Sequence, residues 1–214
     1  LRPLLAGGTT FVIPDEVVYD PKGLVCLLKK YNVTRMLFTP SLLAHTLSSL
    51  PDDVLRANLG QMKYVNLCGE VVSVQMVKRF NALFPDCLLV NLYSISECHD
   101  AAQATLSGPE NELYGPNRNP KYAVAGKVLD NCKLHVLNEQ LTECPIGVFG
   151  EVYVAGPCIA IGYLNMPEQT AERFVKNPFR FTSEPGCEML YRTGDRARFL
   201  PDGQLEVAGR IAFF

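Results

Sequence analysis

The sequence has no tryptophan, only three histidines and no excess of charge of either sign. Lys and Arg number 20 and Asp and Glu 22, which gives a net charge of −2 at pH 7. Nucleic-acid binding depends on basic residues that neutralise phosphates, so we expect no nucleic-acid partner. The apolar runs, such as 36–38 and 42–44, are far shorter than the roughly 20 residues that span a bilayer. We therefore expect no membrane partner either.

The sequence also lacks any C-x-x-C pair, although it contains eight cysteines. No histidine stands at the spacing of a zinc finger, and several cysteines lie inside apolar segments, as Cys26 and Cys87 do. This pattern favours buried free thiols in a reducing, cytoplasmic setting over a disulfide framework. The chain starts without Met and ends on the apolar residues 211–214, so we expect a fragment of a longer protein.

The first half of the chain alternates strand and helix patterns. β-branched or apolar runs predict strands over 10–13, 34–39, 63–67 and 87–92. Helices are expected after the N-cap candidates Asp20 and Ser73 and over residues 40–50. Such alternation is typical of βαβ crossovers and a parallel sheet. We place this α/β subdomain at residues 1–106.

The second half has shorter elements and more turn residues. Residues 109–120 are rich in Pro, Gly and Asn and predict a long surface loop. Strands are expected over 133–137, 150–154, 197–200 and 204–208, and a short helix over 167–175. The predicted fold class is therefore α/β: a parallel sheet with flanking helices, followed by a small antiparallel β-rich or barrel subdomain at 107–214.

Residues 91–97, Asn-Leu-Tyr-Ser-Ile-Ser-Glu, follow an apolar strand and could form a ligand site. In open parallel sheets, ligands bind beyond the carboxyl ends of the strands. Tyr93 could stack on a base, Ser96 could bond a phosphate oxygen, and Glu97 could hold Mg²⁺ as a hard oxygen ligand. The alternative is a polar turn in which the serine and the glutamate serve only as a cap.

Four other segments carry weaker signals. In Tyr-Arg-Thr-Gly-Asp, 191–195, the Asp195 carboxylate could accept from ribose hydroxyls, or the segment could be a charged hairpin corner. Gly69–Glu70 ends a strand where backbone could closely approach a ligand, and Gly209–Arg210 follows the final strand. Residues 98–100, Cys-His-Asp, are not expected to form a nucleophilic triad, because adjacent residues of an extended segment point to opposite faces.

Four phrases together resemble the adenylate-forming enzymes, which include nonribosomal peptide synthetase adenylation domains, acyl-CoA synthetases and luciferases. They are LCGE, NLYSISE, GEVYVAGPCIAIGYLNMPEQTAERFV and YRTGDRARFLPDGQLEVAGR, in the order of that family. The Asn-Pro-Phe at 177–179 resembles the adenylation-domain branch. The resemblance implies that a carboxylic or amino acid is activated by ATP and Mg²⁺ as an acyl-adenylate. A carrier-protein domain with a phosphopantetheine thiol would then take the acyl group.

The resemblance also implies residue roles. Ser96 and Glu97 would be catalytic, with Glu97 as the metal ligand. The nucleotide would contact Gly69, Glu70, Asn91, Tyr93, Asp195 and Arg210. The acid substrate would contact Leu37, Asn66, Cys68, Leu92, Asp100 and Ala101.

The substrate expectation rests on Asp100. An ammonium group is the natural partner of a carboxylate in an apolar pocket, and the phrase SECHD resembles Ebony-type enzymes, which activate β-alanine. We therefore hypothesise a β-amino acid or similar ω-amino acid substrate. The alternatives left open are an acyl- or aryl-CoA ligase and a non-catalytic nucleotide-binding module.

The sequence departs from the family pattern in several places. Ser94 stands where the family has Gly, Ser96 where it has Thr, and Ala212 where the hinge phrase usually has Asp. The family's Ser/Thr/Gly/Lys-rich phosphate loop and the lysine of its small C-terminal domain are not among these 214 residues. We expect the isolated chain to be inactive and the parent protein to be an acid–thiol ligase.

Overall fold

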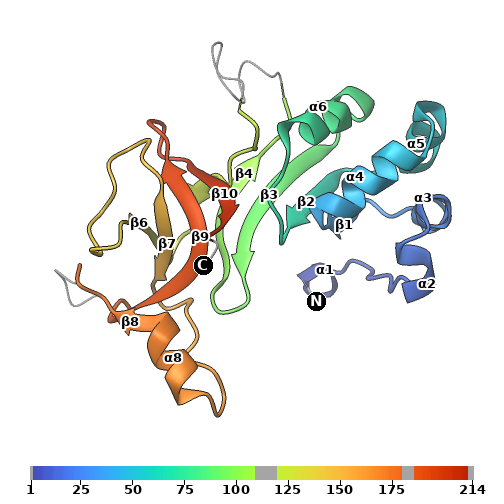
Figure 1. The fold of residues 1–214 in the computed structure, drawn as a ribbon. Coiled ribbons are helices and arrows are strands. Elements are labelled where there is room, and N and C mark those ends of the chain that lie inside the picture. Colours follow the sequence, from blue (N-terminus) through green and yellow to red (C-terminus); the bar gives the residue numbers. More distant parts are fainter. Residues whose placement is uncertain (1, 109–119, 180–185, 212–214) are drawn as a thin grey trace.

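The computed structural model describes residues 2–108, 120–179 and 186–211, and these form two sheets that meet along one side (Figure 1). The first sheet has the order β1-β2-β3-β4-β5. Its strands are β1 (Arg35–Phe38), β2 (Tyr64–Cys68), β3 (Leu88–Ile95), β4 (His99–Thr105) and β5 (Lys127–Val128). β1, β2 and β3 are parallel, whereas β4 and β5 are antiparallel to their neighbours.

The helices of the first half bury apolar side chains in one core with the first sheet. Leu24 of α3, Leu47 of α4, Leu55 of α5 and Phe80 of α6 are each at most 2% exposed and share that core with Leu89 of β3. The helices are α1 (Arg2–Leu5), α2 (Asp15–Val18), α3 (Pro21–Lys30), α4 (Pro40–Ser49), α5 (Asp52–Leu59) and α6 (Val74–Leu83). The predicted parallel sheet with flanking helices is confirmed.

Two of the predicted caps form. The side chain of Asp20 accepts from the Lys22 amide at 3.2 Å, and that of Ser73 accepts from the Met76 amide at 3.3 Å. The prediction missed α5, which Pro51 precedes without a side-chain cap. The strand expected over 10–13 is wrong, because those residues are in irregular structure.

The strand expected to end at residue 92 continues through Ile95 and turns back as β4. The turn is three residues long, Ser96–Cys98, and His99 leaves it with a positive φ of 59°. Residues 91–95 are therefore strand rather than loop, and only Ser96 and Glu97 of the expected ligand loop stand at the tip of a hairpin. The prediction missed this because the polar residues after Leu92 resemble a loop.

The second sheet is antiparallel, with the order β10-β9-β7-β6 and β8 paired to β9. It comprises β6 (Lys133–Leu137), β7 (Gly150–Ala155), β8 (Phe174–Lys176), β9 (Met189–Phe199) and β10 (Leu205–Arg210). The helix α8 (Pro167–Arg173) precedes β8. The predicted antiparallel subdomain is confirmed, although β9 begins eight residues before the expected strand 197–200. The expected loop 109–120 lies almost wholly outside the described residues, as does Ala212.

The two sheets share a core where β4 meets the second sheet. Ala101 and Ala102 of β4 are fully buried in one cluster with Val152, Ala197 and Leu205 of the second sheet. At this junction the Ala125 amide donates to the Leu205 carbonyl at 2.7 Å. β5 comes after residue 107 in the chain but belongs to the first sheet. The subdomain boundary near residue 107 stays a prediction.

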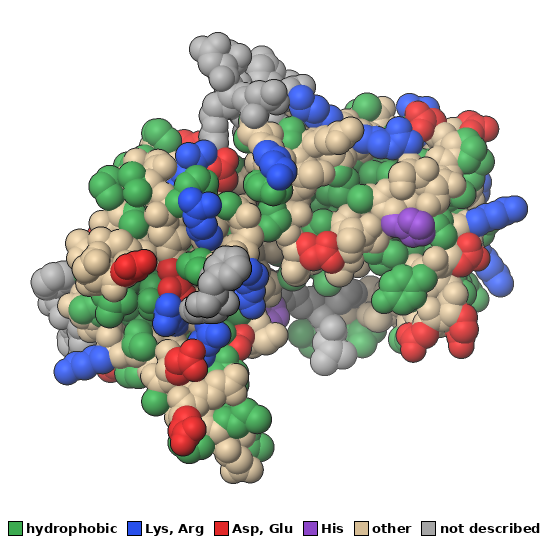
Figure 2. Space-filling view, viewed as in Figure 1, with side chains coloured by type: hydrophobic (Ala, Val, Ile, Leu, Met, Phe, Trp, Pro, Cys, Tyr) green, Lys and Arg blue, Asp and Glu red, His purple; other side chains and the backbone are tan. Residues whose placement is uncertain are grey.

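The surface carries both signs of charge. Basic and acidic side chains are interspersed on the face that Figure 2 shows. None of the helices in the described part of the chain has the length and apolar character needed to cross a bilayer.

Candidate nucleotide site

A cavity of about 550 Å³ lies where the carboxyl ends of β2 and β3 face the end of β10. This volume is within the range of small-molecule sites, about 300 to 1,000 Å³. Seventeen residues line it: Gly69, Glu70, Val71, Val72, Asn91, Leu92, Tyr93, Ser94, Ile95, Ser96, Glu97, Ala123, Ala125, Asp195, Val207, Gly209 and Arg210. All eight residues expected to be catalytic or to contact the nucleotide are among them.

Gly69 and Glu70 form the wall that follows β2. Gly69 has a φ of +91°, and a Cβ there would meet no atom within 4 Å, so the backbone is open to the cavity. The Glu70 carboxylate accepts from the amide and the hydroxyl of Ser41, at 2.9 and 2.7 Å. Because Ser41 lies in the first turn of α4, this contact also sets a negative charge at a helix N-terminus, where it is favourable.

Asn91 ties two walls together. Its side chain is 7% exposed, and its Nδ2 donates to the Val124 carbonyl at 2.8 Å. Ala123 and Ala125 on either side of Val124 line the cavity. The Asn91 amide group therefore holds the backbone 123–125 in place, a contact that its expected role did not include.

Tyr93, Asp195 and Arg210 connect the two sheets at the cavity. The Tyr93 hydroxyl donates to Asp195 Oδ2 at 2.6 Å, and Arg210 Nη1 donates to Asp195 Oδ1 at 3.0 Å. Burial and the neighbouring Asp195 charge hold the pKa of Tyr93 well above its usual value, so Tyr93 remains a donor. The Asp195 carboxylate is 13% exposed and Arg210 is 71% exposed. The arrangement offers a fixed anionic acceptor beside an accessible cation.

Glu97 is held by two tyrosines to which the sequence alone assigns no role. The Tyr163 hydroxyl donates to Glu97 Oε1 and lies 3.3 Å from the Tyr191 hydroxyl. Burial raises the pKa of Glu97, but hydrogen bonds from Tyr163 and Tyr191 outweigh that effect and lower it. Glu97 is therefore an oriented carboxylate at the cavity. Both tyrosines stand in the quoted phrases, at GYL and YRTGD, which was the only signal for them.

The two serines of the site differ from the family pattern without evident strain. Ser94 has no positive φ, so the glycine that the family has there is not required by this backbone. Ser96 is exposed at the hairpin tip and lines the cavity. Its hydroxyl is thus available to a ligand.

Four of the expected substrate residues lie on one face of the first sheet. Leu37 pairs with Asn66, and Cys68, two residues further along β2, pairs with Leu92. Neighbours in register and residues two apart on a strand share a face. Of the four, only Leu92 lines the described cavity.

Asp100 and Ala101 are placed differently. Asp100 lies opposite Ser94 in β4, is 16% exposed, and has Oδ2 at 3.3 Å from His99 Nδ1. Its charge is close enough to help raise the pKa of Cys68, after the larger effect of burial. Ala101 is fully buried in the core and does not line the cavity. The substrate roles of both residues stay predictions.

All eight cysteines are free, as expected, but Cys26, which was expected to be buried, is exposed. Cys98 is 2% exposed, and burial together with neighbouring thiols raises its pKa to about 12. A buried thiol with a raised pKa is a poor nucleophile. This agrees with the rejection of a triad over 98–100.

The fold and the site define a class: an α/β protein with a nucleotide-sized cavity between a parallel-containing sheet and an antiparallel sheet. The family model described as AMP-binding enzyme matches residues 1–164. The chain belongs to the AMP-binding enzyme family.

Individual proteins extend this likeness. Glycine betaine reductase ATRR of Emericella nidulans is 41% identical over 99% of this chain, and gramicidin S synthase 2 of Brevibacillus brevis is 36% identical over 98%. The chain covers 16% and 4% of these two proteins. A crystal structure of the nonribosomal peptide synthetase FmoA3 matches 97% of the chain, and 21% of its own, with a TM-score of 0.80 and 27% identity. CmiS6, at 24% identity and a TM-score of 0.83 over 98% of the chain and 48% of its own, supports the fold alone.

Proposed function

We propose that the protein carrying this chain activates a carboxylic acid with ATP as an acyl-adenylate and passes it to a phosphopantetheine thiol of a carrier domain. The observation that carries this proposal is the convergence of Glu97, Tyr93, Asp195 and Arg210 on one cavity from two sheets. Likeness to gramicidin S synthase 2 and FmoA3 supports it. The eight free cysteines support a cytoplasmic location as part of the same proposal.

The cavity residues fit a nucleotide. Asp195 presents two carboxylate oxygens, which suits the two hydroxyls of a ribose, and Arg210 lies beside it as a cation. The open backbone at Gly69 allows the flat face of a base to approach closely. In this proposal Asp195 binds the ribose, Tyr93 packs near the adenine, and Ser96 donates to a phosphate oxygen.

Glu97 fits Mg²⁺ only together with the nucleotide. The described residues contain no group of three or more His, Cys, Asp or Glu side chains that could hold a metal ion. Mg²⁺ sites commonly use one or two carboxylates completed by substrate phosphates and waters. When bound there, the ion would offset charge on the phosphates, and Glu97, oriented by Tyr163, would be its ligand from this chain.

We further propose that the acid carries a cationic nitrogen. Asp100 is a carboxylate on β4, the strand next to that of Leu92, and its partner in the structure is an exposed histidine. The relative with 41% identity is named a glycine betaine reductase, and glycine betaine carries a quaternary ammonium group. A β-amino acid, an ω-amino acid or a betaine each place a positive charge a short distance from the carboxylate.

The name of that same relative favours a second candidate for the whole protein. In this case acid activation is followed by reduction of the thioester, with a nicotinamide as the hydride donor. The 214 residues would take part in the same activation step in either case. Oxidation of NADPH by the full-length protein with ATP and the acid separates the two candidates.

The test of the proposal is ATP–pyrophosphate exchange by the full-length protein with β-alanine, glycine betaine, L-alanine and propionate. We expect exchange with at least one of β-alanine and glycine betaine. Product that forms only when CoA is added would favour a CoA ligase. Absence of exchange with every acid, together with ATP binding, would favour a non-catalytic nucleotide-binding module.

A prediction concerns Tyr163. We expect Tyr163→Phe to raise the Mg²⁺ concentration for half-maximal exchange by up to about tenfold, because Glu97 loses a donor that orients it. Removal of the hydroxyl from Tyr122, a tyrosine outside the cavity, is the matched control and should leave the Mg²⁺ dependence unchanged. An unchanged Mg²⁺ dependence in Tyr163→Phe would remove Tyr163 from this role.

A further inference from the structure

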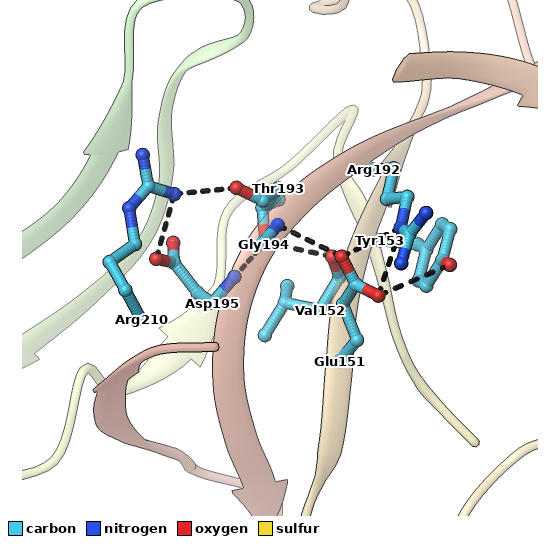
Figure 3. Close-up of polar contacts among 8 residues, drawn as sticks. All are labelled: Glu151, Val152, Tyr153, Arg192, Thr193, Gly194, Asp195 and Arg210. Atoms are coloured by element: carbon cyan, nitrogen blue, oxygen red, sulfur yellow. Dashed lines mark hydrogen bonds and ion pairs between the residues drawn. The ribbon is translucent and has the colours of Figure 1, made fainter. Parts of the chain in front are cut away.

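A second buried carboxylate, Glu151, lies behind the nucleotide cavity and does not line it. Glu151 is 9% exposed. Arg192 Nε donates to both of its oxygens, at 2.9 and 3.0 Å, and the Gly194 amide donates to Oε1 at 3.1 Å (Figure 3). The Tyr153 hydroxyl adds a longer contact at 3.4 Å. An ion pair this buried is weak evidence for stability in itself, so its geometry needs another explanation.

The contact falls at an irregularity of β9. Arg192 pairs with Tyr153 of β7, and Arg196 pairs with Glu151. Three residues of β9, 193–195, therefore oppose the single residue Val152. A bulge of this kind interrupts the ladder and leaves backbone groups without their usual partners, and Gly194 has a φ of +77°, which favours glycine.

Side chains satisfy the backbone groups that the bulge leaves over. Glu151 accepts from the Gly194 amide, and Thr193 Oγ1 accepts from the Asp195 amide at 2.9 Å while donating to the Val152 carbonyl at 2.8 Å. The Thr193 carbonyl accepts from Arg210, and the Gly194 carbonyl accepts from the Ile211 amide at 2.8 Å. Thr193 is 2% exposed, so these bonds are shielded from water.

The bulge decides where Asp195 points. The two extra residues of β9 leave the alternation of faces in phase on either side of the bulge, so the irregular backbone at Gly194, with its positive φ, sets the direction of the adjoining Asp195. In Figure 3, Asp195 lies on the side of Arg210, and Glu151 holds the opposite side of the same turn. Glu151 and Thr193 thus hold the backbone next to Asp195, and Tyr93 and Arg210 hold the Asp195 carboxylate at the cavity.

We propose that Glu151 is a positioning residue for nucleotide binding: through the Gly194 amide it holds the bulge that presents Asp195 to the ribose. This inference rests on the proposed ribose role of Asp195. Glu151 does not touch the nucleotide, and its effect reaches the ligand only through the ribose contact. Loss of the Glu151 carboxylate should therefore weaken the binding of nucleotides that have ribose hydroxyls. The binding of nucleotides without these hydroxyls should not change.

The experiment compares binding of ATP and 2′,3′-dideoxy-ATP to the full-length protein by calorimetry, without the acid substrate. In Glu151→Gln we expect ATP to bind about tenfold more weakly and the dideoxy compound to bind as in the unaltered protein. Glu206→Gln is the matched control. Glu206 is a similarly buried carboxylate, ion-paired with Arg198 in β10 and β9 and away from the cavity. We expect Glu206→Gln to leave the ratio of ATP affinity to dideoxy-ATP affinity unchanged.

Two more variants keep the inference testable if Glu151→Gln folds poorly. Thr193→Val removes the hydroxyl that also holds the bulge in place. It should lower the ratio of ATP affinity to dideoxy-ATP affinity. In Asp195→Ala the ratio should be near one, and adding Glu151→Gln to it should cause no further loss of ATP affinity. Equal weakening of both nucleotides by Glu151→Gln, or an unchanged ratio, would overturn the inference. A ratio near one in the unaltered protein would instead overturn the ribose role of Asp195.

Discussion

Glu97→Gln in the full-length protein should lower ATP–pyrophosphate exchange by about 10² to 10³-fold at saturating acid. Glu97 is a carboxylate at the hairpin tip beside the cavity, and its orientation is fixed by Tyr163. A neutral amide is a much weaker Mg²⁺ ligand than a carboxylate. Removing one group that stabilises developing charge typically costs this much in rate.

The dependence on Mg²⁺ identifies the cause of that loss. If Glu97 is a metal ligand, raising Mg²⁺ should recover part of the lost activity in Glu97→Gln and should change little in the unaltered protein. The control is Glu143→Gln, whose carboxylate is paired with His135 in the second sheet and is 62% exposed. An exchange rate for Glu97→Gln that equals that of Glu143→Gln at limiting Mg²⁺ would refute the metal role.

Much of the architecture follows from local signals in the sequence. The caps at Asp20 and Ser73 and the strand 133–137 can be predicted because each depends on neighbouring residues. The turn of β3 into β4 could not be predicted in this way. Its polar residues take strand geometry because they pair with a following strand rich in small residues, and that pairing is a tertiary contact.

The site shows the same division. Tyr93, Glu97 and Asp195 are recognisable because they stand in phrases that carry a chemical role and they line one cavity. Glu151 and Tyr163 also stand in those phrases, but their contacts lie 43 and 66 positions away in the chain, at Gly194 and Glu97. No pattern of spacing reveals a hydrogen bond over that separation. Their roles emerge only once the two sheets are placed together.

The charge of Asp100 should decide which acid the protein activates. In Asp100→Ala we expect exchange with the preferred cationic acid, β-alanine or glycine betaine, to fall by the equivalent of about 2 to 5 kcal/mol in kcat/KM. The reason is that removal of a largely buried carboxylate leaves the bound ammonium without a compensating charge. Asp100 is 16% exposed, and the neighbouring His99 is 77% exposed.

The panel of acids separates this effect from a general loss of activity. Propionate has no cation to pair with Asp100, so its exchange rate should change little in Asp100→Ala. L-alanine, whose ammonium is on the carbon next to the carboxylate, should be affected less than β-alanine, whose ammonium is one carbon further away. His99→Ala is the control, since it removes the neighbouring exposed side chain and keeps the carboxylate. Equal losses for all four acids, or a preference of the unaltered protein for propionate, would show that Asp100 does not recognise the substrate cation.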